Sequence, residues 1–301
     1  MIISLLDLFN INEFVGVPIS SSIGVTHLFD LLQLPFMQRA IAGGVLMGIL
    51  GGFLGCFVTL RQLSFFSHAV GHSALVGIVL GVLLEINPNW TLLPFTILFG
   101  LGALFLMEKT ELASDSVFSI AVSGALAVGV ILTSFLSGYQ GNLMGVLFGD
   151  ILAIDRGDII LIIILLLASM GFIFATWKTQ ILLTLNPELA KVQGVAVDIH
   201  RYLFVVLLAL TVAVSIKAIG ILLVNAFLVI PAATAKLLTH HFARFMTISI
   251  ALGVLSSLLG MLGSGVFNFA SGPSIVVVQF VGFLGVLSWH QWRQAKAFRQ
   301  P

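Results

Sequence analysis

Charged residues are scarce in this 301-residue chain, and their scarcity decides its class. Asp, Glu, Lys and Arg make up 8% of the residues, against 59% hydrophobic residues and a mean hydropathy of +1.17. Soluble globular domains carry roughly 25% charged residues. The chain is therefore expected to be an integral membrane protein in contact with lipid. Its formal net charge of +1 offers no field for nucleic acid, so no nucleic-acid partner is expected.

Other absences exclude further classes. The single cysteine, Cys56, rules out an internal disulfide and a cysteine-based zinc cluster. No polar stretch exceeds about 30 residues, which is short of the roughly 50 that a separate soluble domain needs. The chain has no GxxxxGK[ST] phosphate-binding loop and no HExxH metalloprotease motif, so it is not expected to hydrolyse ATP or to be an enzyme.

Long apolar runs are what the sequence does contain. They lack the period-two alternation of barrel strands, so an all-α, polytopic transmembrane helical bundle is predicted. Each run could cross a hydrocarbon core of ~30 Å, which takes about 20 residues. The nine runs cover residues 38–60, 65–84, 90–107, 116–137, 157–176, 201–217, 218–238, 245–267 and 274–290. Residues 201–238 could instead be one long span and a half helix, so eight or nine spans are expected.

The remaining segments divide the chain. Residues 1–37, broken by acids and prolines, are predicted to form an interfacial segment, and residues 38–292 the transmembrane domain. Residues 293–301 are predicted to be a basic cytoplasmic tail. With the N-terminus outside and nine spans, ten of the thirteen Lys and Arg residues fall on the cytoplasmic side. Only Arg39, Arg156 and Lys217 fall outside.

Two connections are more than spacers. The outer one, residues 138–158, is predicted to be a re-entrant or surface helix. Its Asp150 and Asp155 could attract cations from outside or could cap a short helix. The inner one, residues 185–198, is predicted to hold a short capped helix on which a cytoplasmic partner docks. That helix and its caps comprise Asn186, Pro187, Glu188, Leu189, Ala190, Lys191, Val192, Gln193 and Gly194.

The stretch RQLSFFSHAVGHSALVG, residues 61–77, carries the main candidate for chemistry. His68 and His72 are four residues apart and therefore share one helix face. Ionisable residues inside a span are costly unless they serve a pathway or find polar partners. The pair is predicted to contact a metal ion, although hydrogen bonding across helices is the alternative. Asn225, in ILLVNAFLVIP, is an additional oxygen ligand or gate, or else an interhelical hydrogen-bonding residue. Pro231, at the end of this stretch, is expected to break the helix.

Several segments together resemble the membrane permease of bacterial ABC importers for zinc and manganese. These are LRQLSFFSHAVGHSALVG, LFGDILAI, NPELAKVQGV and VNAFLVIPAATAKLL, spread over residues 60–285 in the family's order. The resemblance implies a fold similar to the cobalamin and siderophore importer permeases, in the bacterial inner membrane. It also implies a homodimer of permeases, two cytoplasmic ATPase subunits that use ATP, and a metal-binding protein on the outside. Residues 186–195 would then be the helix that couples to the ATPase.

One departure from the family concerns the transported metal. The family usually has an Asp where this chain has His68, followed four residues later by a His, here His72. Imidazole nitrogen suits zinc, whereas carboxylate oxygen suits manganese better. Zinc is therefore the predicted cargo, with manganese or iron as the alternative, and no covalently bound cofactor is expected.

Two rival classes are weaker. A secondary transporter driven by an ion gradient would need buried carboxylates, and the acids here cluster at the ends of the spans. An intramembrane zinc enzyme would need a general base beside the histidines, and Glu85 lies thirteen residues beyond His72.

Overall fold

The computed structural model describes residues 33–110, 112–135, 149 and 151–297, and this part of the chain is helical. Nine of its helices are long and apolar enough to cross a membrane. They are α3 (Pro35–Leu60), α4 (Ser64–Leu83), α5 (Pro88–Lys109), α6 (Ser114–Thr133), α8 (Arg156–Ala175), α11 (Val197–Ile219), α12 (Ile221–Leu238), α13 (Phe242–Phe267) and α14 (Ser271–Ala297). The prediction of a polytopic helical bundle is confirmed, with nine spans among these residues.

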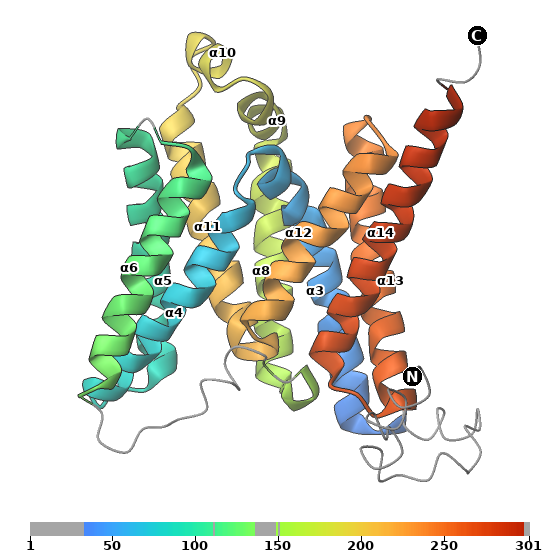
Figure 1. The fold of residues 1–301 in the computed structure, drawn as a ribbon. Coiled ribbons are helices and arrows are strands. Elements are labelled where there is room, and N and C mark those ends of the chain that lie inside the picture. Colours follow the sequence, from blue (N-terminus) through green and yellow to red (C-terminus); the bar gives the residue numbers. More distant parts are fainter. Residues whose placement is uncertain (1–32, 111, 136–148, 150, 298–301) are drawn as a thin grey trace, which may run out of the picture.

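Three shorter elements complete the described fold. A 3-10 turn, η2 (Ile151–Ala153), precedes α8, while α9 (Trp177–Leu185) and α10 (Pro187–Val192) connect α8 to α11. Helix α10 and the end of α14 lie at the same end of the bundle (Figure 1). That end also carries most of the cationic residues, so it is the cytoplasmic end. The outer connection predicted between residues 138 and 158 lies largely outside the described residues, as does the interfacial segment before residue 33.

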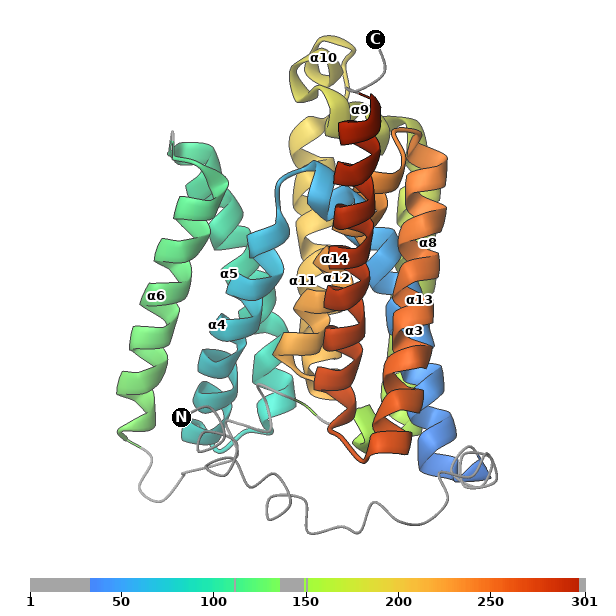
Figure 2. The same ribbon diagram turned by 45° about the vertical axis from the view of Figure 1, so that its right-hand side comes forward.

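The bundle has two sides that meet around α11 and α12. Helices α4, α5 and α6 form one side, and α3, α13 and α14 form the other (Figures 1 and 2). Helix α3 packs against α8, α12 and α13. Fifteen of its residues are buried. The candidate histidines lie on α4, which contacts α5, α6, α11 and α12.

Glycines explain how closely α3 approaches its neighbours. A Cβ on Gly48 would lie 2.7 Å from the backbone of Gly253 on α13. One turn later, the Ser249 hydroxyl donates a 2.8 Å hydrogen bond to the Gly52 carbonyl. Small residues are how membrane helices come close. The glycine-rich run at residues 40–55 therefore packs within the chain, a point that its sequence leaves open.

The junction of α11 and α12 divides the ambiguous run into two spans. Gly220 ends one helix and starts the next with φ 83°, a conformation that glycine adopts without strain. The expectation that Pro231 breaks the helix after Asn225 is wrong. Helix α12 continues through Pro231 to Leu238. Proline removes one backbone hydrogen bond, and Pro231 is buried where α12 packs against its neighbours, α3 among them.

Candidate metal pathway

His68 and His72 form a close pair in the first half of α4. Their ring centroids lie 4.4 Å apart, with an angle of 71° between the planes. Helix α4 starts at Ser64, so His72 lies about 12 Å along it at ~1.5 Å per residue. His68 is exposed in the single chain and His72 half-buried. The pair therefore presents imidazole nitrogens to open space beside the bundle.

Asn225 joins this pair from α12. Its Nδ2 lies 3.5 Å from His68 Nδ1, although 157 residues separate them in sequence. Its Oδ1 is buried and has no hydrogen-bond partner among the described residues. An unpaired buried oxygen is costly, so a hydrogen-bond donor or a metal ion beside this amide would stabilise it. The structure thus brings together all three residues predicted for the metal.

The three side chains are too few for a complete zinc shell. Zinc usually takes four ligands, and within the described residues no group of three His, Cys, Asp or Glu side chains could hold a metal. A transport site differs from a structural one because it must release its ion. The open side of His68 leaves room for water or another subunit to supply further ligands.

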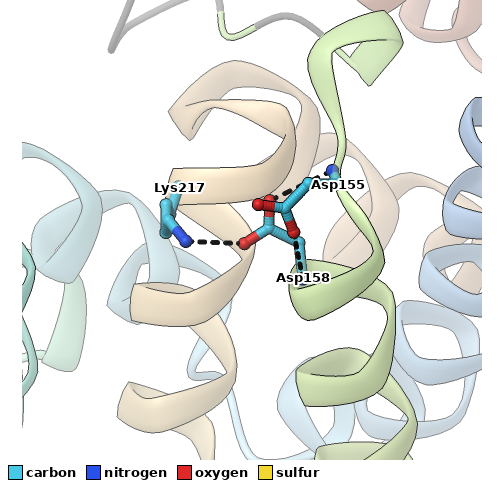
Figure 3. A network of polar contacts seen from close by, with 3 residues as sticks. All are labelled: Asp155, Asp158 and Lys217. Carbon is cyan, nitrogen blue, oxygen red and sulfur yellow. Dashed lines mark hydrogen bonds and ion pairs between the residues drawn. The ribbon is translucent and has the colours of Figure 1, made fainter. Parts of the chain in front are cut away.

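At the outer end, Asp155 has one of the two roles predicted for it, that of a helix cap. Asp155 is the N-cap of α8, where its Oδ1 accepts the Asp158 N–H at 2.7 Å, and Asp158 Oδ2 accepts the Asp155 N–H at 3.4 Å. The backbone hydrogen bond from Asp158 lowers the pKa of Asp155. Asp158 also forms an ion pair with Lys217 of α11, with Nζ and Oδ1 2.8 Å apart (Figure 3). Asp155 is thus a helix cap, and Asp150 lies outside the described residues.

At the cytoplasmic end, the short helix forms as predicted. The Asn186 side chain accepts the Leu189 N–H at 3.0 Å, Pro187 occupies the first turn, and Gly194 has φ 77°. Leu189 and Val192 are 46% and 84% exposed. Exposed apolar side chains on a rigid, capped turn suit the groove of a partner protein.

A partly buried arginine connects this turn to the histidine-bearing helix. Arg61, in the turn before α4, donates from Nε to Thr184 Oγ1 at 3.1 Å and from Nη2 to Gln180 Oε1 at 2.7 Å. Its guanidinium also lies 4.3 Å from the Phe204 ring centroid on α11. Helix α9, which carries Gln180 and Thr184, leads directly into Asn186. The short helix α10 and the start of α4 are thus joined through α9 and Arg61.

Sequence reasoning missed both of these charged contacts. Lys217 and Asp158 are 59 residues apart, and Arg61 and Gln180 are 119 apart. The sequence does show that these charged residues lie at or near the ends of apolar runs. A charge in such a place requires a polar partner, but the sequence does not identify that partner.

Spanning helices, a polar cluster facing open space and an exposed cytoplasmic helix define a multi-pass membrane transport subunit. The comparisons give its family. The chain matches the ABC 3 transport family over residues 33–290 and belongs to it. It is a bacterial ABC-importer permease subunit and not the ATPase, as predicted. Membership implies ATPase and binding-protein partners.

Relatives with assigned transport roles fall into two groups. The chain is 32% identical to the high-affinity zinc uptake system membrane protein ZnuB of Haemophilus influenzae, over 83% of this chain and 95% of the relative. It is 31% identical to the manganese transport system membrane protein MntC of Listeria monocytogenes, over 85% and 93%. The relatives thus divide between two metals at nearly equal identity.

Two solved structures share the fold. PsaBC from Streptococcus pneumoniae, solved in complex with Fab, matches with a TM-score of 0.75 and 29% identity, over 87% of this chain and 95% of the other. A metal-chelate type ABC transporter in an inward-facing conformation matches with a TM-score of 0.64 and 17% identity, over 90% and 96%. The predicted fold class is confirmed.

Proposed function

We propose that the chain is the permease subunit of an ATP-driven zinc importer. The observation that carries the proposal is the contact of His68, His72 and Asn225 across α4 and α12. Imidazole nitrogens suit zinc and other borderline metals. The ion is the cargo, and the chain needs no covalently bound cofactor.

Asn225 serves this site in one of two ways. If its amide is turned, the buried Oδ1 accepts the Nδ1–H of His68 and leaves Nε2 for the metal, which is how partners orient ligating histidines. Alternatively, Oδ1 is itself a ligand. Both uses give Oδ1 a partner, and in the first the amide nitrogen takes the buried position instead.

A second copy of the permease completes the site in this proposal. His68 is exposed in the single chain, and two histidines with one amide fall short of a zinc shell. A symmetric dimer that faces these surfaces toward each other doubles the ligands around one pathway. A binding protein delivers the ion from outside, where Asp150 and Asp155 remain candidates for attracting it.

ATP hydrolysis by the partner subunits drives the transport. Their groove receives residues 186–194, and the displacement reaches α4 through Gln180, Thr184 and Arg61. This contact links the coupling helix to Arg61, and His68 lies seven residues beyond Arg61, or about two helical turns.

Manganese is the second candidate, because relatives named for manganese match as well as those named for zinc. Uptake of both ions in competition tests the choice. His68→Ala and His72→Ala should each lower zinc uptake at least tenfold, whereas His68→Asp should shift preference toward manganese. Wild-type uptake of both ions in both alanine variants would remove the histidines from the pathway. Transport in vesicles without ATP or an ATPase subunit would favour a secondary transporter.

A further inference from the structure

A cavity of about 230 Å³ lies at the cytoplasmic end, apart from the histidines. Its walls come from the turn between α3 and α4, from α5, from the junction of α9 and α10, and from α11. Its polar lining includes Arg61, Gln62, Thr184 and Arg201. The volume far exceeds the ~15 Å³ that a single water needs, so the cavity has room for a larger group.

Positive charge in this cavity exceeds negative charge. Among the described residues, Arg201 pairs with Glu108 at 3.3 Å, whereas Arg61 has no carboxylate partner. Burial, and to a smaller extent the charge of Arg201, lower the pKa of Arg61 to about 10. The guanidinium therefore stays charged at neutral pH while it bears the cost of partial burial.

The hydrogen bonds of Arg61 leave one of its guanidinium nitrogens, Nη1, available to a ligand. Nε and Nη2 donate to Thr184 and Gln180, and within the described chain Nη1 donates to no side chain or carbonyl. Neutral oxygens orient the guanidinium without neutralising it. Arginine presents a planar fork of donors that matches oxyanions, phosphate above all.

We infer that this cavity is a binding site for a phosphate group, held between Arg61 and Arg201 at the cytoplasmic face. The group belongs to a phospholipid head of the inner leaflet or to free phosphate. It bridges the start of α4, the base of α10 and the start of α11, since all three contribute to the walls. The bound anion thereby relieves the repulsion between the two arginines and stiffens the connection between the coupling helix and the metal helix.

Thermal unfolding of the full chain in maltoside micelles, which contain no phosphate, tests the site. The probes are inorganic phosphate at constant ionic strength, phosphatidylglycerol, and diacylglycerol, which has the same tails without the phosphate. At ten times its dissociation constant, a specific ligand should raise the midpoint by about 2 °C. A response to both phosphate probes identifies free phosphate as sufficient, and a response to phosphatidylglycerol alone identifies the lipid.

Variants separate this site from general charge effects. Arg201→Gln should abolish the phosphate response, whereas Arg244→Gln, which removes an exposed cation at the same end, should retain it. Gln62→Glu places a carboxylate at the cavity wall and should raise the midpoint without phosphate while removing the response. The Gln62→Glu variant keeps Arg61 and its hydrogen bonds intact.

Three results would overturn the inference. The first is that neither phosphate nor phosphatidylglycerol shifts the midpoint. The second is that Arg201→Gln and Gln62→Glu show the same shift as the wild type. The third is stabilisation only by added ATPase subunit, lost in Arg201→Gln, which would assign the cavity to a carboxylate of the partner protein. The metal proposal is independent, because its test is uptake by the histidine variants.

Discussion

The ion pair between Lys217 and Asp158 holds α11 to α8 at the outer end of the bundle, and Lys217→Met should weaken that connection. The pair spans 2.8 Å between Nζ and Oδ1 (Figure 3). The Asp158 side chain is only 9% exposed, so without the lysine it becomes a buried carboxylate with no opposite charge. Among the described residues, the Asp155 N–H, at 3.4 Å, is then the hydrogen-bond donor that remains to it.

The loss of stability expected for Lys217→Met follows from how exposed each partner of the ion pair is. Breaking a fully buried pair costs about 3–5 kcal/mol. The Lys217 side chain is 41% exposed, so water already screens part of the attraction, and a loss of about 2 kcal/mol in the free energy of unfolding is expected. Denaturant titration in mixed micelles, with helix content as the signal, measures it.

A double variant and a control separate charge burial from general damage. Adding Asp158→Asn to Lys217→Met removes the buried charge, so stability should return to within about 1 kcal/mol of the wild type. Lys236→Met removes an exposed lysine at the other end of the membrane and should change stability by less than about 0.5 kcal/mol. A double variant as unstable as the single one would show that the lone carboxylate is not the cause.

Two further predictions concern the coupling turn and the glycine contact. Asn186→Ala should cost about 1 kcal/mol of local stability by removing the bond to the Leu189 N–H, and should lower permease-stimulated ATP hydrolysis; Asn186→Asp should restore both. Equal hydrolysis in all three proteins would contradict a coupling role. Gly48→Ala should cost about 1–3 kcal/mol, because its Cβ meets the backbone of Gly253, whereas Gly102→Ala, where the Cβ meets open space, should stabilise the helix by about 0.5–1 kcal/mol. Unfolding titrations that rank the two alanine variants in the opposite order would refute the close-packing argument.

The spans were predictable because lipid demands long apolar runs, and composition alone reveals these. The caps at Asn186 and Gly194 were predictable as well, since each depends on neighbours in the chain. The sequence left open whether residues 201–238 form two spans that meet near Gly220 or one long span and a half helix. Lys217, three residues before Gly220, suits either the end of a span or a buried ion pair. The prediction of a helix break at Pro231 was wrong, because packing that the sequence does not show can compensate for the loss of one hydrogen bond.

The candidate site was predictable only within one helix. The spacing of His68 and His72 follows from helical geometry, whereas the approach of Asn225 depends on how α12 packs on α4. Asp155 could be read as a cap or as a cation attractor, and the capping box with Asp158 shows the cap. The pairing of Lys217 with Asp158 required the fold, because sequence distance carries no information on which charges meet.

Gly220 has a geometric consequence for the proposed metal ligands. Asn225 lies five residues beyond this pivot, or about 7.5 Å along α12 at ~1.5 Å per residue. A tilt of about 10° at the pivot would then displace Asn225 by about 1.3 Å, a large step beside the roughly 2 Å length of a zinc–ligand bond. Such a tilt of the start of α12, beside the ion pair of Lys217 with Asp158, would open or close the coordination shell while most of the bundle stays still.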